Sequence, residues 1–214
     1  MEVRWKIWKQ IGSIQKDMNA THQMIRFDNA QELGAWYDQK YTEMGGGWKI
    51  GEEGARRIME WSGIVADQSK VLLDVGCGDG DFIRTAQQYV RCIGIDLSSV
   101  GIEYAKSMNL NAEFYVADIE TYQHVPQVDY ITSLGSIEHC ISIPNALSRC
   151  FANLRNKGKF YCLVPNELWK HFDQPQETTH TDEEWSHLFT KAGFSIEKIE
   201  RRSDLTDFLL RKDV

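Results

Sequence analysis

Apolar and polar positions follow two different periods along most of this chain. Short apolar or alternating runs predict strands at 71–75, 91–96, 112–118, 128–134, 159–165, 194–202 and 205–211. Apolar residues at helical spacing predict helices between them, at 79–89, 98–108, 143–155 and 181–193. Thr181 and Glu184 are expected to form a capping box at the start of the last helix. Strands that alternate with helices indicate a mostly parallel sheet covered by helices on both faces.

The first fifty residues have a different character. An apolar stripe at helical spacing is formed by Val3, Ile7, Ile11, Ile14 and Met18. It is followed by an aromatic cluster and the glycine run 45–47; the cluster comprises Trp36, Tyr37, Tyr41 and Trp48. Such a segment has apolar surface to bury but is too short to fold alone. We expect residues 1–50 to form a helical cap that orders over a ligand, and residues 51–214 to form the main domain. The alternative is that the stripe forms a homodimer contact.

The stretch "VLLDVGCGDGDF" (71–82) carries the first chemical signal, because a glycine-rich turn follows a buried strand. A dinucleotide site would need a third glycine where this chain has Asp81, and no Gly-Lys-Ser/Thr follows for a phosphate loop. The acids Asp74 and Asp79 beside the turn disfavour a phosphate. They suit a ligand with a cationic end, although they could also only brace the turn.

Two further acids end the next two strands. Asp96 comes 22 residues after Asp74, and Asp118 comes 22 residues after Asp96. The carboxyl ends of parallel strands form the ligand edge of an open α/β sheet, so the three acids are expected to lie together. Asp96 could accept hydrogen bonds from a ribose diol and Asp118 one from an adenine amino group. The alternatives are a helix cap for Asp96 and an ordinary loop acid for Asp118. The pattern describes a nucleoside with a charged tail and no phosphate.

Five segments together resemble the class I S-adenosylmethionine-dependent methyltransferases, over about residues 52–202. They are "LLDVGCGDG" (72–80), "GIDLS" (94–98), "ADIE" (117–120), "SLGSIEHC" (133–140) and "LRNKGKFYCLVPN" (154–166). The resemblance implies a Rossmann-like sheet of seven strands in the order 3-2-1-4-5-7-6, with the seventh strand antiparallel. It also implies S-adenosylmethionine as cofactor and S-adenosylhomocysteine as product.

The resemblance assigns cofactor contacts to particular residues. Asp74 and the turn of Gly76, Cys77, Gly78 and Gly80 would hold the methionine part, although Cys77 could serve packing alone. The adenosine part would contact residues at the ends of the second and third strands: Asp96 and Leu97 at the ribose, and Asp118 and Ile119 at the adenine. Leu134 would pack near the ribose or the sulfur.

The methyl acceptor is less clearly indicated. His139, in a Glu-His pair like that of the small-molecule branch of the family, is the candidate catalytic residue; it could be a base, a substrate contact or a structural residue. Further substrate candidates are Tyr37, Tyr41, Trp48, His171 and His180; the alternatives are aromatic packing for the first three and a solvated loop for the two histidines. We expect a small-molecule acceptor, methylated on oxygen or nitrogen in secondary or cofactor metabolism. A peptide methyltransferase or a non-catalytic S-adenosylmethionine-binding protein are the alternatives.

Composition narrows the class of protein. The 214 residues carry a formal net charge of −7, which disfavours nucleic acid, and "SLGS" replaces the Asp/Asn-Pro-Pro-Tyr segment of nucleic-acid amine methyltransferases. No apolar run reaches the roughly 18 residues of a membrane span. Five cysteines without a CxxC pair indicate a reduced, cytoplasmic location and no zinc site. We expect a monomer or homodimer without membrane, nucleic-acid or metal partners.

Overall fold

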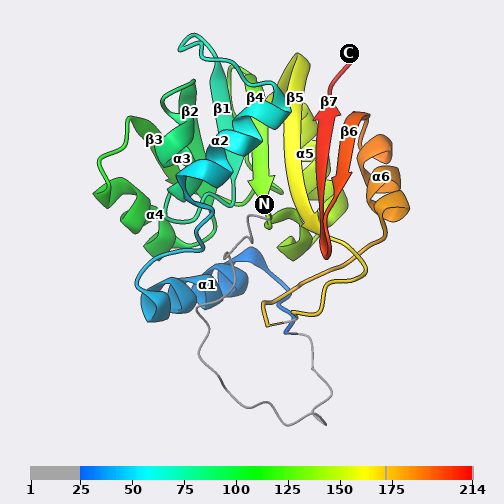
Figure 1. Cartoon of the computed structure of the whole chain (residues 1–214). Coiled ribbons are helices and arrows are strands. Elements are labelled where there is room, and N and C mark those ends of the chain that lie inside the picture. Colours follow the sequence, from blue (N-terminus) through cyan, green and yellow to red (C-terminus); the bar gives the residue numbers. More distant parts are fainter. Residues whose placement is uncertain (1–24, 172, 214) are drawn as a thin grey trace, which may run out of the picture.

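The computed structural model describes residues 25–171 and 173–213 (Figure 1). The predicted apolar stripe between Val3 and Met18 lies outside the described residues, so its helix and its role stay predictions. The aromatic cluster and the whole predicted sheet lie within them.

Seven strands and six α-helices form the described chain. The strands are β1 (Val71–Val75), β2 (Arg91–Asp96), β3 (Ala112–Val116), β4 (Val128–Leu134), β5 (Leu154–Pro165), β6 (Ser195–Arg201) and β7 (Leu205–Arg211). The helices are α1 (Ala30–Met44), α2 (Gly51–Ser62), α3 (Asp81–Ala86), α4 (Ser99–Ser107), α5 (Ile143–Asn153) and α6 (Asp182–Lys191). A short 3-10 helix, η1 (Ile137–His139), follows β4.

The strands form one sheet in the order β3-β2-β1-β4-β5-β7-β6. Neighbouring strands from β3 to β5 are parallel, whereas β7 is antiparallel to both β5 and β6. This confirms the fold, the strand order and the antiparallel seventh strand that the family resemblance implies. The parallel part explains the two-sided burial of β1 and β4, whose side chains pack on helices at both faces.

Alternate residues of β1 face two separate cores. Leu72 packs in a cluster with residues of α2, α3 and α4, including Ile58, Ile83 and Ile102. Leu73 packs in the other cluster, with residues of α5 and α6 that include Leu147. The period of two along the strand therefore divides the helices between the two faces of the sheet, as Figure 1 shows for α2 in front and α5 behind.

Helix α1 was not predicted, although its ends carry recognisable signals. Asn29 caps the first turn, where its side-chain oxygen accepts a hydrogen bond from the Glu32 backbone N–H at 2.9 Å. Gly45 ends the helix in the left-handed region, with φ 67°. Between these ends, Leu33, Tyr37 and Tyr41 lie at helical spacing and all line the same cavity, so one face of the helix is marked in the sequence as well.

Two other predicted boundaries differ from the structure by three residues or more. Helix α3 ends at Ala86 rather than at residue 89. Strand β5 begins at Leu154 rather than at residue 159, because Leu154 pairs with Val128 before an irregularity that ends where Lys159 pairs with Tyr130. Within the residues described, no helix is both long and apolar enough to cross a membrane.

Candidate active site

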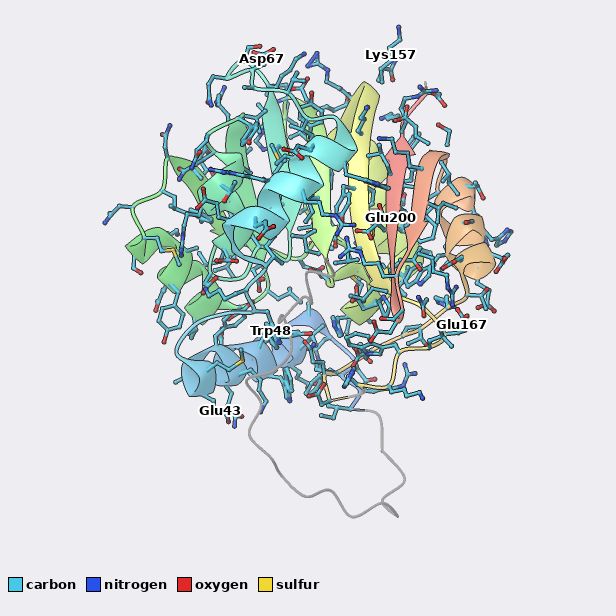
Figure 2. All side chains as sticks on the ribbon, viewed as in Figure 1. Glu43, Trp48, Asp67, Lys157, Glu167 and Glu200 are labelled. Atoms are coloured by element: carbon cyan, nitrogen blue, oxygen red, sulfur yellow. The ribbon has the colours of Figure 1, made fainter. Side chains whose placement is uncertain are left out.

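Helix α1 lies across the end of the sheet at which the parallel strands finish (Figure 1). Figure 2 places Trp48 between α1 and the sheet, with Glu43 on the outer side of the same helix. A cavity lies at this end of the sheet. Its walls include most of the residues that the sequence singled out: Tyr37, Tyr41, Trp48, Asp74, Gly76, Cys77, Gly78, Asp96, Leu97, Asp118, Ile119, Leu134 and His139.

The glycine turn passes directly beneath α1. Gly76, Gly78 and Gly80 all adopt left-handed backbone angles, with φ of 72°, 53° and 81°. A Cβ at Gly78 would lie 2.6 Å from the hydroxyl oxygen of Tyr41, which α1 supplies. The turn therefore needs glycine for its backbone shape and for the approach of Tyr41. Gly80 is not part of the cavity wall and instead begins α3.

Asp96 holds the shape of the turn. Its Oδ2 accepts a hydrogen bond from the Gly78 N–H at 2.9 Å, and its Oδ1 accepts one from the Ser98 N–H at 2.8 Å. Each carboxylate oxygen can accept a second hydrogen bond, so Asp96 keeps capacity for ligand hydroxyls. Burial raises its pKa to about 6, against the lowering effect of these hydrogen bonds. The N-cap of α4 is Ser98, whose side chain accepts a hydrogen bond from the Gly101 N–H, so the structure does not support the helix-cap alternative for Asp96.

Asp74 contributes a second buried carboxylate to the same wall. It is 2% exposed, and its Oδ1 accepts a hydrogen bond from the Thr132 hydroxyl at 2.7 Å. Burial raises its pKa to about 7, with a further contribution from the charge of Asp96. Two buried acids in one wall favour a ligand that brings positive charge and N–H or O–H donors.

Asp118 and Ile119 follow β3 and line the cavity beside Asp96 and Leu97. Asp118 is half-buried, and its Oδ1 accepts a hydrogen bond from the Glu120 N–H at 2.8 Å. Ile119 is buried, and Leu134 closes the wall from the end of β4. This part of the wall combines an acid with flat apolar surface, which suits a nucleoside base.

Asp79, which the sequence suggested for a cationic ligand or for bracing the turn, binds the linker after α1. Its Oδ2 accepts a hydrogen bond from the Gly47 N–H at 2.8 Å and forms an ion pair with Lys49. Asp81, two residues on, accepts hydrogen bonds from the N–H groups of Ile50 and Gly51, both at 2.9 Å. These acids hold residues 47–51, the linker between α1 and α2, so bracing is the role that the geometry supports for Asp79.

Asp38 anchors α1 to the start of α4. Its Oδ1 accepts hydrogen bonds from the Ser98 hydroxyl at 2.6 Å and from the Val100 N–H at 3.0 Å. Its Oδ2 accepts one from the Ser99 hydroxyl at 3.0 Å. Although burial raises the pKa of Asp38, these hydrogen bonds bring it below the ordinary value. An acid at the N-terminus of a helix is also favoured by the helix dipole.

Replacement of Asp38 by alanine is expected to loosen α1. Three hydrogen bonds to the charged carboxylate are lost, so amide exchange in residues 30–44 should accelerate roughly ten-fold or more. Hydrogen–deuterium exchange with mass spectrometry measures this directly. Glu43→Ala is the matched control, because Glu43 lies on the outer side of α1 and its partners among the described residues, Gln39 and Lys40, belong to the same helix. Equal exchange in the two variants would show that Asp38 does not hold the helix.

His139, in η1, also lines the cavity. Its Nδ1 is 2.9 Å from the carbonyl oxygen of Pro175, so this nitrogen carries the proton in the neutral ring and donates it. Burial lowers the pKa of His139 to about 4, although the Pro175 carbonyl and Asp173 act in the opposite direction. So low a pKa makes the ring a weak proton acceptor near neutral pH, which favours a substrate contact over a base.

Three of the five predicted substrate residues lie in the cavity wall. The Tyr37 ring meets the His139 ring edge-on, with centroids 6.2 Å apart, and Trp48 packs against both Tyr37 and Tyr41. The other two, His171 and His180, lie elsewhere. His171 packs against Trp169, and His180 packs over Trp185 at the start of α6. Their segment does reach the site, but through Trp169, Gln174 and Glu177.

The structure adds acids that the sequence did not single out for this wall, and two of them are almost fully buried. Glu138 precedes His139 and is 3% exposed, while Glu177 lies in the segment after β5 and is 1% exposed. A helical or strand period could not find Glu177, because residues 173–180 are irregular. In the sequence, Glu138 was noted only as the residue next to His139 in the Glu-His pair.

The residues present fit S-adenosylmethionine. The wall holds three acids at successive strand ends, a glycine turn with no space for a side chain at Gly78, and an apolar surface at Ile119 and Leu134. Apart from Gly80, the residues expected to contact the methionine, ribose and adenine thus line one cavity. Among the described residues, no group of three or more His, Cys, Asp or Glu side chains is arranged to hold a metal ion.

Comparison with known proteins gives matches in sequence. Residues 50–202 match the family model described as methyltransferase domain. The chain is 31% identical over 159 residues to phosphoethanolamine N-methyltransferase 1 of Arabidopsis thaliana, covering 67% of this chain and 32% of that protein. It is 30% identical over 109 residues to the ubiquinone biosynthesis O-methyltransferase of Rhodopseudomonas palustris, covering 47% and 42% of the two chains. The chain thus spans less than half the length of these curated relatives.

Comparison of structures gives a likeness in fold. The 1,6-didemethyltoxoflavin-N1-methyltransferase of Burkholderia thailandensis, solved with bound 1,6-didemethyltoxoflavin and S-adenosylhomocysteine, superposes with a TM-score of 0.61. Sequence identity is 19%, and the match covers 75% of this chain and 76% of that chain. The matching family model covers well over half of the chain and includes the glycine turn and the six strands from β1 to β6. The chain therefore belongs to the methyltransferase domain family, among the class I S-adenosylmethionine-dependent methyltransferases.

Proposed function

We propose that this chain transfers a methyl group from S-adenosylmethionine to an oxygen or nitrogen atom of a small-molecule acceptor. The observation that carries the proposal is a single cavity that extends from the cofactor residues Asp74, Gly78 and Asp96 to His139 beneath α1. A donor and an acceptor that share one covered cavity can be aligned for in-line transfer. Alignment of this kind can supply roughly 7–11 kcal/mol of the barrier.

Each part of the wall has an expected task. S-adenosylmethionine, when bound, supplies a methyl group activated on a positively charged sulfur. Asp96 is expected to accept the ribose hydroxyls, and the glycine turn to run along the methionine part. Tyr37 and Trp48 are expected to exclude water from the transfer path, with α1 and its linker acting as the cap over the cavity. His139 is expected to contact the acceptor through its unprotonated Nε2.

The covered shape supports a small acceptor rather than a peptide. Tyr41 is 4% exposed and Leu33 1% exposed, so the inner side of α1 is packed against the domain. A peptide would need an open groove at this end of the sheet. The curated relatives are named for phosphoethanolamine and for ubiquinone biosynthesis.

The direct test is transfer of a labelled methyl group. The protein is incubated with methyl-labelled S-adenosylmethionine and a metabolite extract, and labelled products are separated by mass. The proposal expects label in products of small mass and formation of S-adenosylhomocysteine. Label found only in proteins or peptides would contradict the small-molecule acceptor. Cofactor binding without any transfer would indicate the non-catalytic alternative.

A further inference from the structure

Two buried glutamates form a distinct feature of the cavity wall. Glu138 comes from η1, directly after β4, and Glu177 comes from the irregular segment after β5. They are 3% and 1% exposed, yet both belong to the cavity wall. The tertiary fold therefore brings together two carboxylates that are far apart in the sequence.

Both glutamates have a carboxylate oxygen that lacks a hydrogen-bond partner. Oε2 of Glu138 and Oε2 of Glu177 are buried and unpartnered within the part of the chain that the structure describes. The other oxygen of Glu138, Oε1, is 3.9 Å from Nε2 of His139. Buried polar atoms in native proteins are nearly always satisfied, so two orphaned oxygens in one cavity wall point to a ligand with donors.

The electrostatics of the pair define the charge of that ligand. Burial, together with the charge of Glu177, raises the pKa of Glu138 to about 8. Burial likewise raises the pKa of Glu177 to about 7, and Asp173 adds to the rise, although Trp169 and the Gln174 backbone donate hydrogen bonds that lower it. A cation placed between two such groups would stabilise the charged form of both.

Aromatic side chains also line the cavity. Tyr37 and Trp169 belong to the same wall as the two glutamates, and the Tyr37 ring lies beside His139. Aromatic faces attract ammonium groups as well as apolar ones. An alcohol would bring one donor and no charge to the pair, whereas a primary ammonium brings three N–H donors and a positive charge.

We propose that the methyl acceptor is an amine, which Glu138 and Glu177 bind as its ammonium form. The inference rests on the proposed function and narrows its acceptor from oxygen or nitrogen to nitrogen. It assigns substrate binding to two residues, one of which also serves the proton transfer.

The step balances with the groups present. The bound ammonium gives one N–H proton to Oε2 of Glu138, and the nitrogen recovers its lone pair. That lone pair forms the new N–C bond to the methyl carbon as the C–S bond breaks. The electron pair of the broken bond stays on sulfur, which becomes a neutral thioether, and the methylated nitrogen carries the positive charge. The raised pKa of Glu138 makes it a stronger base than an ordinary carboxylate.

The test compares two probes of one skeleton, 2-phenylethylamine and 2-phenylethanol, in titrations of the full chain saturated with S-adenosylhomocysteine. The amine is an ammonium at pH 7 and the alcohol is neutral. We expect the amine to bind at least ten-fold more tightly than the alcohol. Glu138→Gln and Glu177→Gln should each weaken amine binding by roughly ten-fold or more, because a charge-assisted hydrogen bond is lost.

A matched control separates local from general charge effects. Glu167→Gln makes the same substitution in the segment after β5, but Glu167 is exposed, pairs with Arg201 and is not in the cavity wall (Figure 2). It should leave amine binding unchanged. Thermal unfolding verifies that both cavity variants fold, and the near-identical shape of glutamine makes this expected.

The outcomes also separate this inference from the proposed function. Equal binding of amine and alcohol while S-adenosylhomocysteine binds normally would overturn the amine acceptor alone. Loss of S-adenosylhomocysteine affinity in Glu138→Gln and Glu177→Gln would also overturn it, by showing that the pair serves the cofactor. Failure of the wild-type chain to bind S-adenosylhomocysteine would instead contradict the proposed function.

Discussion

Gly78→Val is expected to abolish cofactor binding, with a loss of affinity for S-adenosylhomocysteine of at least 100-fold. The backbone at this position has φ 53°, a region that a β-branched residue adopts only at considerable cost. The added side chain would also meet the buried Tyr41 hydroxyl, with Cβ at 2.6 Å. The turn and α1 would have to separate, and the cavity between them would change shape. Titration calorimetry measures the loss.

The control for this variant is Gly45→Val. Gly45 has a similar φ of 67°, but a Cβ there would meet no atom of the described residues within 4 Å, and Gly45 is not among the described residues that line the cavity. It therefore reproduces the backbone strain without the collision, and cofactor affinity should change little. Circular dichroism establishes that both variants are folded. Unchanged affinity in Gly78→Val would show that the ligand does not lie along this turn.

Asp96→Asn is expected to weaken S-adenosylhomocysteine binding by roughly 10- to 150-fold, which corresponds to ~1.5–3 kcal/mol for a charged hydrogen-bond acceptor. Both carboxylate oxygens accept a backbone N–H, one from Gly78 and one from Ser98. An amide has only one oxygen, so its NH₂ group would face one of these donors. The substitution thus removes a ribose acceptor and disturbs the turn together, and urea unfolding should report a loss of ~1–3 kcal/mol.

Asp67→Asn provides the comparison for that variant. Asp67 also accepts a backbone N–H, from Ser69 at 2.9 Å, but it lies at the opposite end of the sheet from α1 (Figure 2). Cofactor affinity should remain at the wild-type value. Wild-type affinity in Asp96→Asn would refute the assignment of Asp96 to the ribose, whatever the variant does to stability.

The parts of the fold predicted from sequence are those with local signals. All seven strands follow apolar or alternating runs, and the capping box of Thr181 and Glu184 is present at the start of α6. The strand order came from the family resemblance, because a parallel sheet of this size permits many orders. Helix α1 was missed although Asn29 and Gly45 marked its ends and Leu33, Tyr37 and Tyr41 lie at helical spacing between them.

The candidate site likewise contains residues that the sequence could indicate and residues that it could not. Residues at the ends of β1, β2 and β3 could be found because the carboxyl ends of parallel strands must share one edge. The roles of Asp38, Asp79 and Glu177 depend on contacts with distant segments, which no local period reports. Asp79 meets a residue 32 positions away and Asp38 one 60 positions away. His139 was found, but its low pKa arises from burial that only the tertiary structure reveals.

The turn after β1 has two sides, and this has a thermodynamic consequence. Gly78 and Cys77 face the cavity, whereas Asp79 binds Gly47 and Lys49 of the linker to α1. Free energies of binding at two sites of one element are linked reciprocally. If attachment of the linker to the turn raises cofactor affinity by some factor, cofactor binding must strengthen the attachment of the linker by the same factor. Variation in residues 47–51 can therefore tune cofactor affinity without altering a single residue that touches the cofactor.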